Sequence, residues 1–382
     1  MAFIYFKEVE FHYEGTHLNI FEHLNLEIDT AWKTGIVAKN GRGKSTLLNL
    51  IQGELKPTRG EIISELETCL FPMHIQKTDE SVLNVIKTCI GPIRKYECIM
   101  EDYMNGTVSE AVYLEALEHY IELGGYELEY LIEKEFNLIG LSPNLISRAY
   151  QTLSGGEQTK VQIVALFLKQ NTFVLLDEPT NHLDINGVQV LGEYLNKKDG
   201  FIVVSHHRDF LDQCINHVVS ITKAGIHIEQ GDYSSWEYNY DLKKGFEQAK
   251  REKIETDIKR LEKTAAQKRN WSQAKEKQKI GAGDKGYIGH KAAKLMKRAL
   301  SVENRLDKQI EEKKTLIQYR ERTPNIKFSK LDNIEKILDV THLKVGYADD
   351  IIIDDFTFAV RKGDRLAITG RNGSGKSTLI KA

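Results

Sequence analysis

The stretch that decides the fold is Ala38-Lys39-Asn40-Gly41-Arg42-Gly43-Lys44-Ser45-Thr46. It follows the short apolar run 34–38, which suits a buried strand. Its glycines let backbone N–H groups curl around phosphate oxygens, and the helix expected after them directs its positive end at the same anion. Lys44 is expected to reach the terminal phosphates and Ser45 to ligate Mg²⁺. Alanine at position 38, the motif's first glycine, restricts the turn if φ must be positive there, but we expect binding to be retained.

The same motif recurs near the end of the chain, behind the apolar run 365–369, which is also predicted to be a buried strand. It reads Gly370-Arg371-Asn372-Gly373-Ser374-Gly375-Lys376-Ser377-Thr378, so Lys376 and Ser377 take the places of Lys44 and Ser45. An aromatic residue precedes each copy at a similar distance, Tyr13 in the first and Tyr347 in the second. We therefore expect two homologous domains, the second incomplete because few residues follow Lys376.

A second phosphate-binding surface is predicted at Leu153-Ser154-Gly155-Gly156-Glu157-Gln158, just before the helical run 159–169. Ser154, Gly155 and Gly156 at a helix start present N–H groups to an anion by the same physics as the first loop. This motif is one of three beyond the glycine loop that decide which class of P-loop domain the sequence belongs to.

Two apolar strands end in side chains suited to hydrolysis. The run 173–176 leads into Asp177 and Glu178; Asp177 is expected to hold Mg²⁺ through water, and Glu178 to polarise an attacking water. The run 201–204 leads through Ser205 to His206, which is placed to bond a γ-phosphate and orient that water. The alternative is that His206 has a purely structural role. His207, the next residue, is a second histidine that could be mistaken for the functional one.

Residues 237–330 have the pattern of a helical hairpin. Apolar residues recur at helical spacing in two arms, which indicates a narrow seam between antiparallel helices. They are Ile254, Ile258, Leu261 and Ala265 in the first arm, and Leu295, Ala299, Val302, Leu306 and Ile310 in the second. Four glycines between the arms, Gly281, Gly283, Gly286 and Gly289, mark a tip.

Charge is unevenly distributed along the chain, although the net charge is only −2. Residues 241–320 hold 23 Lys/Arg and 12 Asp/Glu, so the hairpin is basic and the rest is acidic. Trp271 and Tyr287 lie among the basic residues, a mixture that suits phosphate contacts and base stacking. A solvated charged helix pair is the simpler alternative.

The remaining composition favours a soluble, cytoplasmic protein. Hydrophobic residues make up 41% of the 382, enough for a sizeable core, and no window is apolar enough for a membrane span. The N-terminus lacks the basic start and apolar core of a signal peptide. The four cysteines, at 69, 89, 98 and 214, show no metal-ligand spacing and are expected to be reduced thiols.

Taken together, these motifs resemble the ABC ATPase family and, within it, the ABC-F proteins; the most specific match is Asp177-Glu178-Pro179-Thr180-Asn181-His182-Leu183-Asp184. The resemblance implies that ATP with Mg²⁺ is bound and hydrolysed, that Tyr13 and Tyr347 stack on adenine, and that Asp184 belongs to a loop contacting the opposite cassette. The family's Mg²⁺-sensing glutamine aligns with Met73, so whether Gln76 serves instead stays open.

The resemblance also implies an α/β fold with three parts: a P-loop ABC nucleotide-binding domain at 1–236, an α-helical hairpin linker at 237–330, and the start of a second ABC domain at 331–382. In ABC-F proteins such a linker enters the ribosome and contacts rRNA and tRNA. The run 267–272 and the tip look most like the ribosome-protecting branch that confers lincosamide, streptogramin A and pleuromutilin resistance. A housekeeping ABC-F translation factor, a transporter ATPase subunit and a DNA-repair ABC protein are the alternatives.

Overall fold

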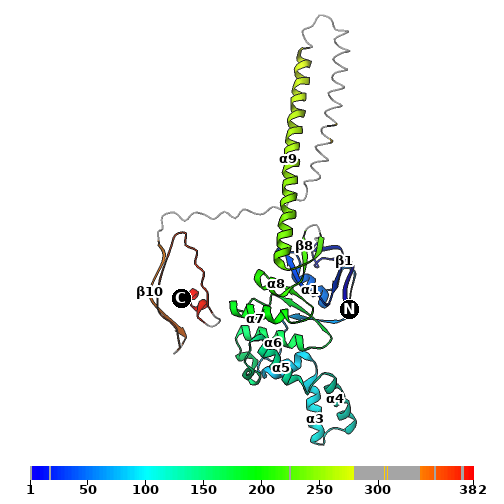
Figure 1. Cartoon of the computed structure of the whole chain (residues 1–382), viewed down its shortest axis with the longest axis vertical. Coiled ribbons are helices and arrows are strands. Elements are labelled where there is room, and N and C mark those ends of the chain that lie inside the picture. The colour runs from blue at the N-terminus through cyan, green and yellow to red at the C-terminus, as the bar shows by residue number, and fades with distance from the viewer. Residues whose placement is uncertain are drawn as a thin grey trace. The chain divides into compact units, whose positions relative to one another are not determined.

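The computed structural model describes residues 2–16, 19–222, 225–278, 305, 308, 336–347, 350–370 and 374–382 (Figure 1). By its packing the chain divides into two units, one of Met1–Trp236 with Ile334–Ala382 and the other of Glu237–Asn333.

Two sheets organise residues 2–230. An antiparallel sheet has the order β2-β1-β4 and is built from β1 (Phe3–Phe11), β2 (Phe21–Asp29) and β4 (Arg59–Ser64). A six-stranded sheet has the order β5-β6-β7-β3-β8-β9. Its strands are β3 (Lys33–Ala38), β5 (Glu67–Phe71), β6 (Thr172–Asp177), β7 (Phe201–Val204), β8 (His217–Thr222) and β9 (Gly225–Gln230).

The parallel strands of the six-stranded sheet place the predicted motifs together. Strands β5, β6, β7, β3 and β8 run parallel, and only β9 is antiparallel. Strand β7 is buried along its whole length, as its unbroken Phe-Ile-Val-Val run predicts. Because the carboxyl ends of parallel strands share one edge of a sheet, the residues after β3, β6 and β7 converge there.

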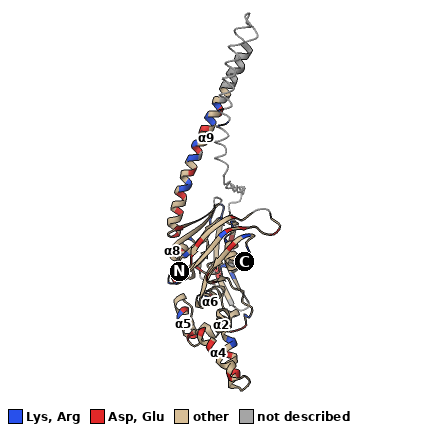
Figure 2. Cartoon of the chain, turned by 90° about the vertical axis from the view of Figure 1, so that its right-hand side faces the viewer, with Lys and Arg blue, Asp and Glu red and all other residues tan. Residues whose placement is uncertain are grey.

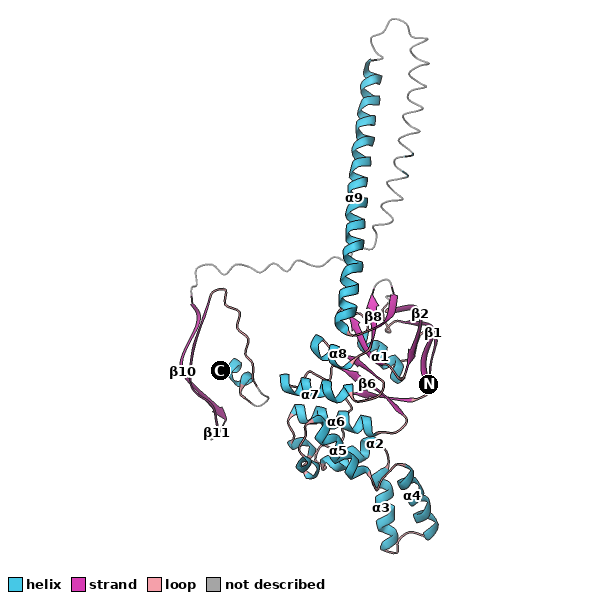
Figure 3. Cartoon of the chain, viewed as in Figure 1, coloured by secondary structure: helices cyan, strands magenta, loops and turns pink. Residues whose placement is uncertain are grey.

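Helices connect these strands along the chain (Figure 3). They are α1 (Lys44–Gln52), α2 (Val82–Ile90), α3 (Ile93–Met104), α4 (Glu110–Glu122), α5 (Leu128–Ile139), α6 (Gly155–Leu168), α7 (Ile185–Asn196) and α8 (Arg208–Cys214), with short 3-10 helices η1 (Pro143–Ser147) and η2 (Tyr150–Thr152). The main core lies between the two sheets and α1, and includes Ile4, Ile28, Ile36, Leu47 and Val204. Apolar burial of this kind supplies most of the driving force for folding.

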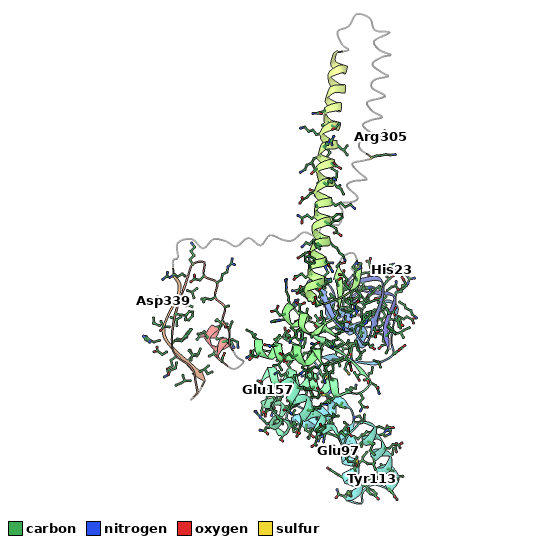
Figure 4. All side chains as sticks on the ribbon, viewed as in Figure 1. His23, Glu97, Tyr113, Glu157, Arg305 and Asp339 are labelled. Atoms are coloured by element: carbon green, nitrogen blue, oxygen red, sulfur yellow. The ribbon has the colours of Figure 1, made fainter. Side chains whose placement is uncertain are left out.

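Helices α3 and α4 lie side by side as a projecting hairpin that the sequence patterns did not predict (Figure 3). Tyr103 and Tyr113 stack across it with ring centroids 4.4 Å apart. At its base the buried Lys87 ammonium lies 2.8 Å from Glu97, which Figure 4 labels, and 3.4 Å from Glu129. A buried lysine needs such partners, so this cluster ties α3 to α2 and α5.

The first arm of the predicted hairpin linker lies in α9 (Tyr233–Gln278), a continuous helix of 46 residues whose exposed side carries both signs of charge (Figure 2). Ile258 is buried and Ile254 and Leu261 are half-buried, while most of their neighbours are exposed. These three residues therefore lie on one face, as the predicted seam requires. The tip glycines, Tyr287 and the second-arm residues Leu295, Ala299, Val302, Leu306 and Ile310 lie outside the described residues.

The C-terminal segment contains β10 (Lys336–Tyr347) paired antiparallel with β11 (Asp350–Arg361), and α11 (Lys376–Lys381). The strand predicted at 365–369 is wrong: these residues form no regular element, and Leu366 and Ile368 are exposed. The corresponding β3 is held between β7 and β8. Residues 365–369 have no such neighbours among the described residues, so their backbone groups lack strand partners.

Within the described ranges, no helix combines the length and the apolar character needed to cross a lipid bilayer.

Candidate functional site

The loop between β3 and α1 has the backbone geometry of an anion cradle. Gly41 and Gly43 have φ of 76° and 88°, in the left-handed region that favours glycine. Gly43 caps α1, whose first N–H groups have no partner within the helix and point toward the loop. Ala38 is paired with Ile221 as the last residue of β3, so this position does not need a positive φ and alanine is accommodated.

Three charged or titratable side chains from different elements meet beside this loop. The Lys44 ammonium donates to the Ala38 carbonyl at 3.2 Å and lies 3.4 Å from His206 Nε2. His206 Nε2 in turn lies 3.3 Å from Glu178 Oε1. The start of α1 and the turns after β6 and β7 thus bring Lys44, Glu178 and His206 together, as the shared sheet edge requires.

Glu178 is held in an unusual environment. Its φ is 50°, and its N–H donates to the Val204 carbonyl at 2.9 Å. Its Oε1 is buried and accepts no hydrogen bond from the described part of the chain; His206 is within ion-pair range but outside hydrogen-bond geometry. Burial raises the pKa of the Glu178 carboxyl, Asp177 adds to this, and His206 and Lys44 oppose it. A carboxylate with a raised pKa is suited to accept a proton near neutral pH.

The glycine-serine motif begins α6 earlier than the sequence predicts. The helix runs from Gly155 rather than from residue 159, because Ser154 and Glu157 form a capping box. The Ser154 N–H and hydroxyl each donate to Glu157 Oε2 at 2.8 Å, and Glu157 is labelled in Figure 4. Gly155 and Gly156 therefore form the first turn, where helix N–H groups are left for an external acceptor.

The first predicted adenine-stacking residue lies close to the loop. The Tyr13 hydroxyl is 3.0 Å from the Thr46 hydroxyl, and its ring packs edge-on against Phe11 at 5.1 Å. Tyr13 remains 44% exposed, which leaves ring surface for a stacking partner. Tyr347 is the last residue of β10, and its side chain lies outside the described residues.

The stretch predicted to contain the Mg²⁺-sensing glutamine is organised by a residue that sequence reasoning missed. The Met73 N–H donates to Gln162 Oε1 at 3.0 Å, and Gln162 Nε2 donates to the Tyr150 hydroxyl at 2.8 Å. Gln162 lies on α6, so this contact joins the loop after β5 to the helix that begins at Gly155. Gln76 is exposed in that loop and makes no hydrogen bond within the described part of the chain.

Ser45 and Asp177 are the residues that could hold Mg²⁺ in the first copy. Ser45 is in the first turn of α1 and Asp177 is the last residue of β6. The described residues contain no cluster of three or more His, Cys, Asp or Glu that could hold a metal ion. This sparse donor set fits Mg²⁺, which keeps several waters and shares its remaining sites with phosphate oxygens.

The second loop repeats the local geometry of the first where it is described. Gly375 caps α11 with φ 85°, as Gly43 caps α1, and the Lys376 ammonium donates to the Gly370 carbonyl at 2.8 Å. Ser374 is exposed and Thr378 is buried. Arg371, Asn372 and Gly373 and the side chain of Ser377 lie outside the described residues.

The family model described as "ABC transporter" matches residues 21–181 and 353–382. The chain is 28% identical to "Energy-dependent translational throttle protein EttA" of Escherichia coli K12, over 95% of this chain and 63% of that protein. It is 27% identical to "Ribosome protection protein VmlR" of Bacillus subtilis, over 96% and 59%, and 26% identical to "ABC transporter F family member 5" of Arabidopsis thaliana, over 97% and 52%. The chain thus spans less than two thirds of the length of these relatives.

Solved ATP-binding cassettes align with part of this chain. A nucleotide-free ATP-binding cassette from an ABC transporter aligns at 19% identity with a TM-score of 0.42, over 60% of this chain and 92% of that one. Since the family model covers half of the sequence, the chain belongs to the ABC transporter family, and the six-stranded sheet with its glycine loop is the P-loop α/β fold of a nucleotide-binding domain.

Proposed function

We propose that the chain is part of an ABC-F protein that binds and hydrolyses ATP and protects the ribosome from antibiotics by means of its linker. The observation that carries the enzymatic part is the convergence of Lys44, Glu178 and His206 beside the glycine loop. The ribosomal part rests on the basic hairpin at 237–330 and on similarity to EttA and VmlR along nearly the whole chain.

In the first copy of the motif set, separate residues would bind ATP and hydrolyse it. Backbone N–H groups from Asn40 to Thr46 and the Lys44 ammonium bind the phosphates, and Tyr13 stacks on the base. Glu178 accepts a hydrogen bond from the attacking water, and His206 orients that water beside the γ-phosphate. Mg²⁺ bound by Ser45 and Asp177 would neutralise phosphate charge. Ser154, Gly155 and Gly156 would contact the nucleotide of an opposing cassette.

The second copy takes the same roles with its own residues in this proposal: Gly370 to Thr378 around the phosphates, Ser377 as a Mg²⁺ ligand and Tyr347 on the base. Gln76 stays a proposed metal-sensing residue. Because Gln76 is exposed, the hydrogen bond between Met73 and Gln162 is a second candidate for linking this loop to α6. ATP would close the two cassettes head to tail, and hydrolysis would open them.

The linker would be the part of the chain that acts on the ribosome. The domain limits are 1–236, 237–330 and 331–382, the partner is the ribosome through rRNA and tRNA, and the location is the cytoplasm. Basic side chains along the two arms would contact phosphates, and the tip would act where the drug binds or on the surrounding RNA.

Co-sedimentation with ribosomes tests the proposal. We expect association in the presence of a non-hydrolysable ATP analogue, loss of association with ADP, and loss in Lys44→Ala, because this variant lacks the phosphate-binding ammonium. Absence of association in every nucleotide state would contradict it and favour a transporter ATPase. Cells that express the protein should also tolerate lincosamide, streptogramin A or pleuromutilin drugs; ribosome association without tolerance would instead favour a housekeeping translation factor.

A further inference from the structure

A pair of hydroxyl groups joins the two turns that carry Glu178 and His206. The Thr180 and Ser205 hydroxyl oxygens are 3.0 Å apart. Ser205 is only 8% exposed, and its hydroxyl also accepts the His207 N–H at 3.1 Å. The Ser205 hydroxyl is thus fixed on both sides, one contact within its own turn and one to the neighbouring turn.

The two bridging residues are close in sequence to the two proposed catalytic side chains. Thr180 lies two residues after Glu178, and Ser205 directly precedes His206. A main-chain bond from the Glu178 N–H to the Val204 carbonyl, at 2.9 Å, also joins the two turns, and His206 lies within ion-pair range of the Glu178 carboxylate. The main-chain bond at Glu178 and the hydroxyl bridge at Thr180 therefore both hold one turn against the other.

The side chains that the bridge would align do not hold each other firmly. Glu178 Oε1 and His206 Nε2 are 3.3 Å apart, yet no hydrogen bond reaches Oε1. The His206 side chain is 61% exposed, so packing does not fix it. Their separation thus depends on where the two turns are held, and the main-chain bond and the hydroxyl bridge both contribute to holding them.

We propose that Thr180 and Ser205 are positioning residues for ATP hydrolysis, and that their hydroxyl bridge sets the separation of Glu178 and His206. This inference rests on the proposed ATPase function. Neither hydroxyl is part of the glycine loop or of Tyr13, so neither is needed to bind nucleotide. Because a misplacement of about 1 Å can cost on the order of 100-fold in rate, losing the bridge should slow the chemical step and spare binding.

The test is a double-mutant cycle on ATP hydrolysis with Thr180→Val, Ser205→Ala and the double variant. Valine keeps the shape of threonine and removes its hydroxyl. We expect each single variant to lower kcat by about tenfold or more with KM for ATP changed by less than about twofold, and the double variant to be no worse than either, since one bridge is lost in all three. Thr180→Ser should restore most of the rate because it keeps the hydroxyl.

Ser220→Ala is the matched control. Ser220 is 4% exposed on β8, and its hydroxyl donates to the His227 carbonyl at 3.4 Å. The variant therefore removes a similarly buried hydroxyl that lies outside the two turns. It should leave kcat and KM unchanged. Unchanged kcat in folded Thr180→Val, additive effects in the double variant, or a KM increase that accounts for the loss would overturn the proposal; if Thr180→Val does not fold, Ser205→Ala against Thr180→Ser decides.

A second readout separates this proposal from the ATPase assignment. The imidazole NMR signal of His206, identified by its loss in His206→Gln, should shift in Thr180→Val and Ser205→Ala and return in Thr180→Ser. If the unaltered protein shows no hydrolysis, the proposed function fails, while this spectrum still tests whether the bridge positions His206. An unshifted His206 signal in both bridge variants would overturn the positioning role whatever the activity.

Discussion

Glu178 combines burial, a strained backbone and a carboxylate oxygen without a hydrogen bond, features that cost stability and are usual where a site has a chemical task. The Glu178→Gln variant keeps the side chain's shape and removes its capacity to accept a proton. We expect ATP binding to be retained, hydrolysis to fall by about 100-fold or more, and ribosome association to last longer. Nucleotide titrations measure the first of these three effects, hydrolysis assays the second, and the rate of dissociation from ribosomes the third.

Lys44→Ala provides the contrast for that variant. It removes the ammonium that faces Ala38 and His206, and should weaken ATP binding itself. If Glu178→Gln weakens binding as Lys44→Ala does, or hydrolyses ATP at the normal rate, the role given to Glu178 is wrong.

His217 offers a test at low pH, away from the nucleotide site. Its ring stacks on Trp32 with centroids 4.1 Å apart and planes at 8°, and burial lowers its pKa below the ordinary 6.5 although Asp29 opposes this. The unfolded chain then binds a proton that the folded chain does not. The contribution of His217 to stability is therefore fully present above pH 6.5 and is lost as the pH falls from there through the folded pKa.

His217→Phe keeps a stacked ring and removes the titrating group. Between about pH 7.5 and pH 5.5 we expect its urea midpoint to fall less than that of the unaltered protein, because only the latter gains a proton on unfolding. Equal falls in the two proteins would show that His217 does not contribute to the acid sensitivity.

Residues in continuous motifs could be placed from the sequence, and residues that act across turns could not. Lys44, Glu178 and His206 each follow an apolar run, so their shared sheet edge was predictable. Gln162 was missed because nothing in a helical run indicates which polar side chain turns toward a distant loop. The Thr180–Ser205 bridge was missed for the same reason, since its partners come from two separate strands.

Among the elements, the glycine loop and α1 depend on two glycines with different surroundings. Both have positive φ, which costs alanine on the order of 1 kcal/mol at either position. A Cβ at Gly43 would also lie 2.7 Å from Ile20 Cγ2 and 3.0 Å from the ring of buried Phe21, whereas at Gly41 nothing lies within 4 Å. We expect Gly43→Ala to lower the urea midpoint clearly more than Gly41→Ala, and to weaken ATP binding further.

The comparison of these two variants separates backbone strain from crowding. Similar midpoints would mean that Ile20 and Phe21 move aside without cost and that φ alone matters. In that case the cradle would be more adaptable than its packing indicates.

Element boundaries followed local patterns only where neighbouring strands or caps agreed with them. The helix after the glycine-serine motif begins at Gly155 because Ser154 and Glu157 form a box that periodicity alone does not reveal. The run 365–369 has the apolar pattern of β3, but a buried parallel strand exists only between partners. Helices α3 and α4 were not predicted, although apolar residues such as Ile93, Tyr96, Met100 and Tyr103 recur in α3 at helical spacing.

For the whole molecule, the sequence predicted a P-loop domain, a helical linker and a second P-loop, because each carries its own motif or period. The arms of that linker are expected to provide affinity for RNA. Changing Lys268, Arg269, Lys275 and Lys277 of α9 to Gln should weaken ribosome binding and flatten its salt dependence, by about 0.7–0.9 in logarithmic slope for each lost phosphate contact. Lys243, Lys244, Lys250 and Lys253, in the N-terminal half of α9, form a control set of equal charge. Equal losses in both sets would mean that net charge alone matters.

The tip of the linker is expected to carry the protective effect itself. Phosphate contacts set affinity, whereas the shape and stacking of a loop decide what is recognised. Removing residues 282–288 leaves both arms and both P-loops unaltered, so ATP binding and ribosome association should persist while protection in a drug-inhibited translation assay is abolished. Replacing those residues by a short glycine-containing turn is the decisive control. If that turn restores full protection, the tip only reverses the chain, and the housekeeping or transporter alternatives gain support.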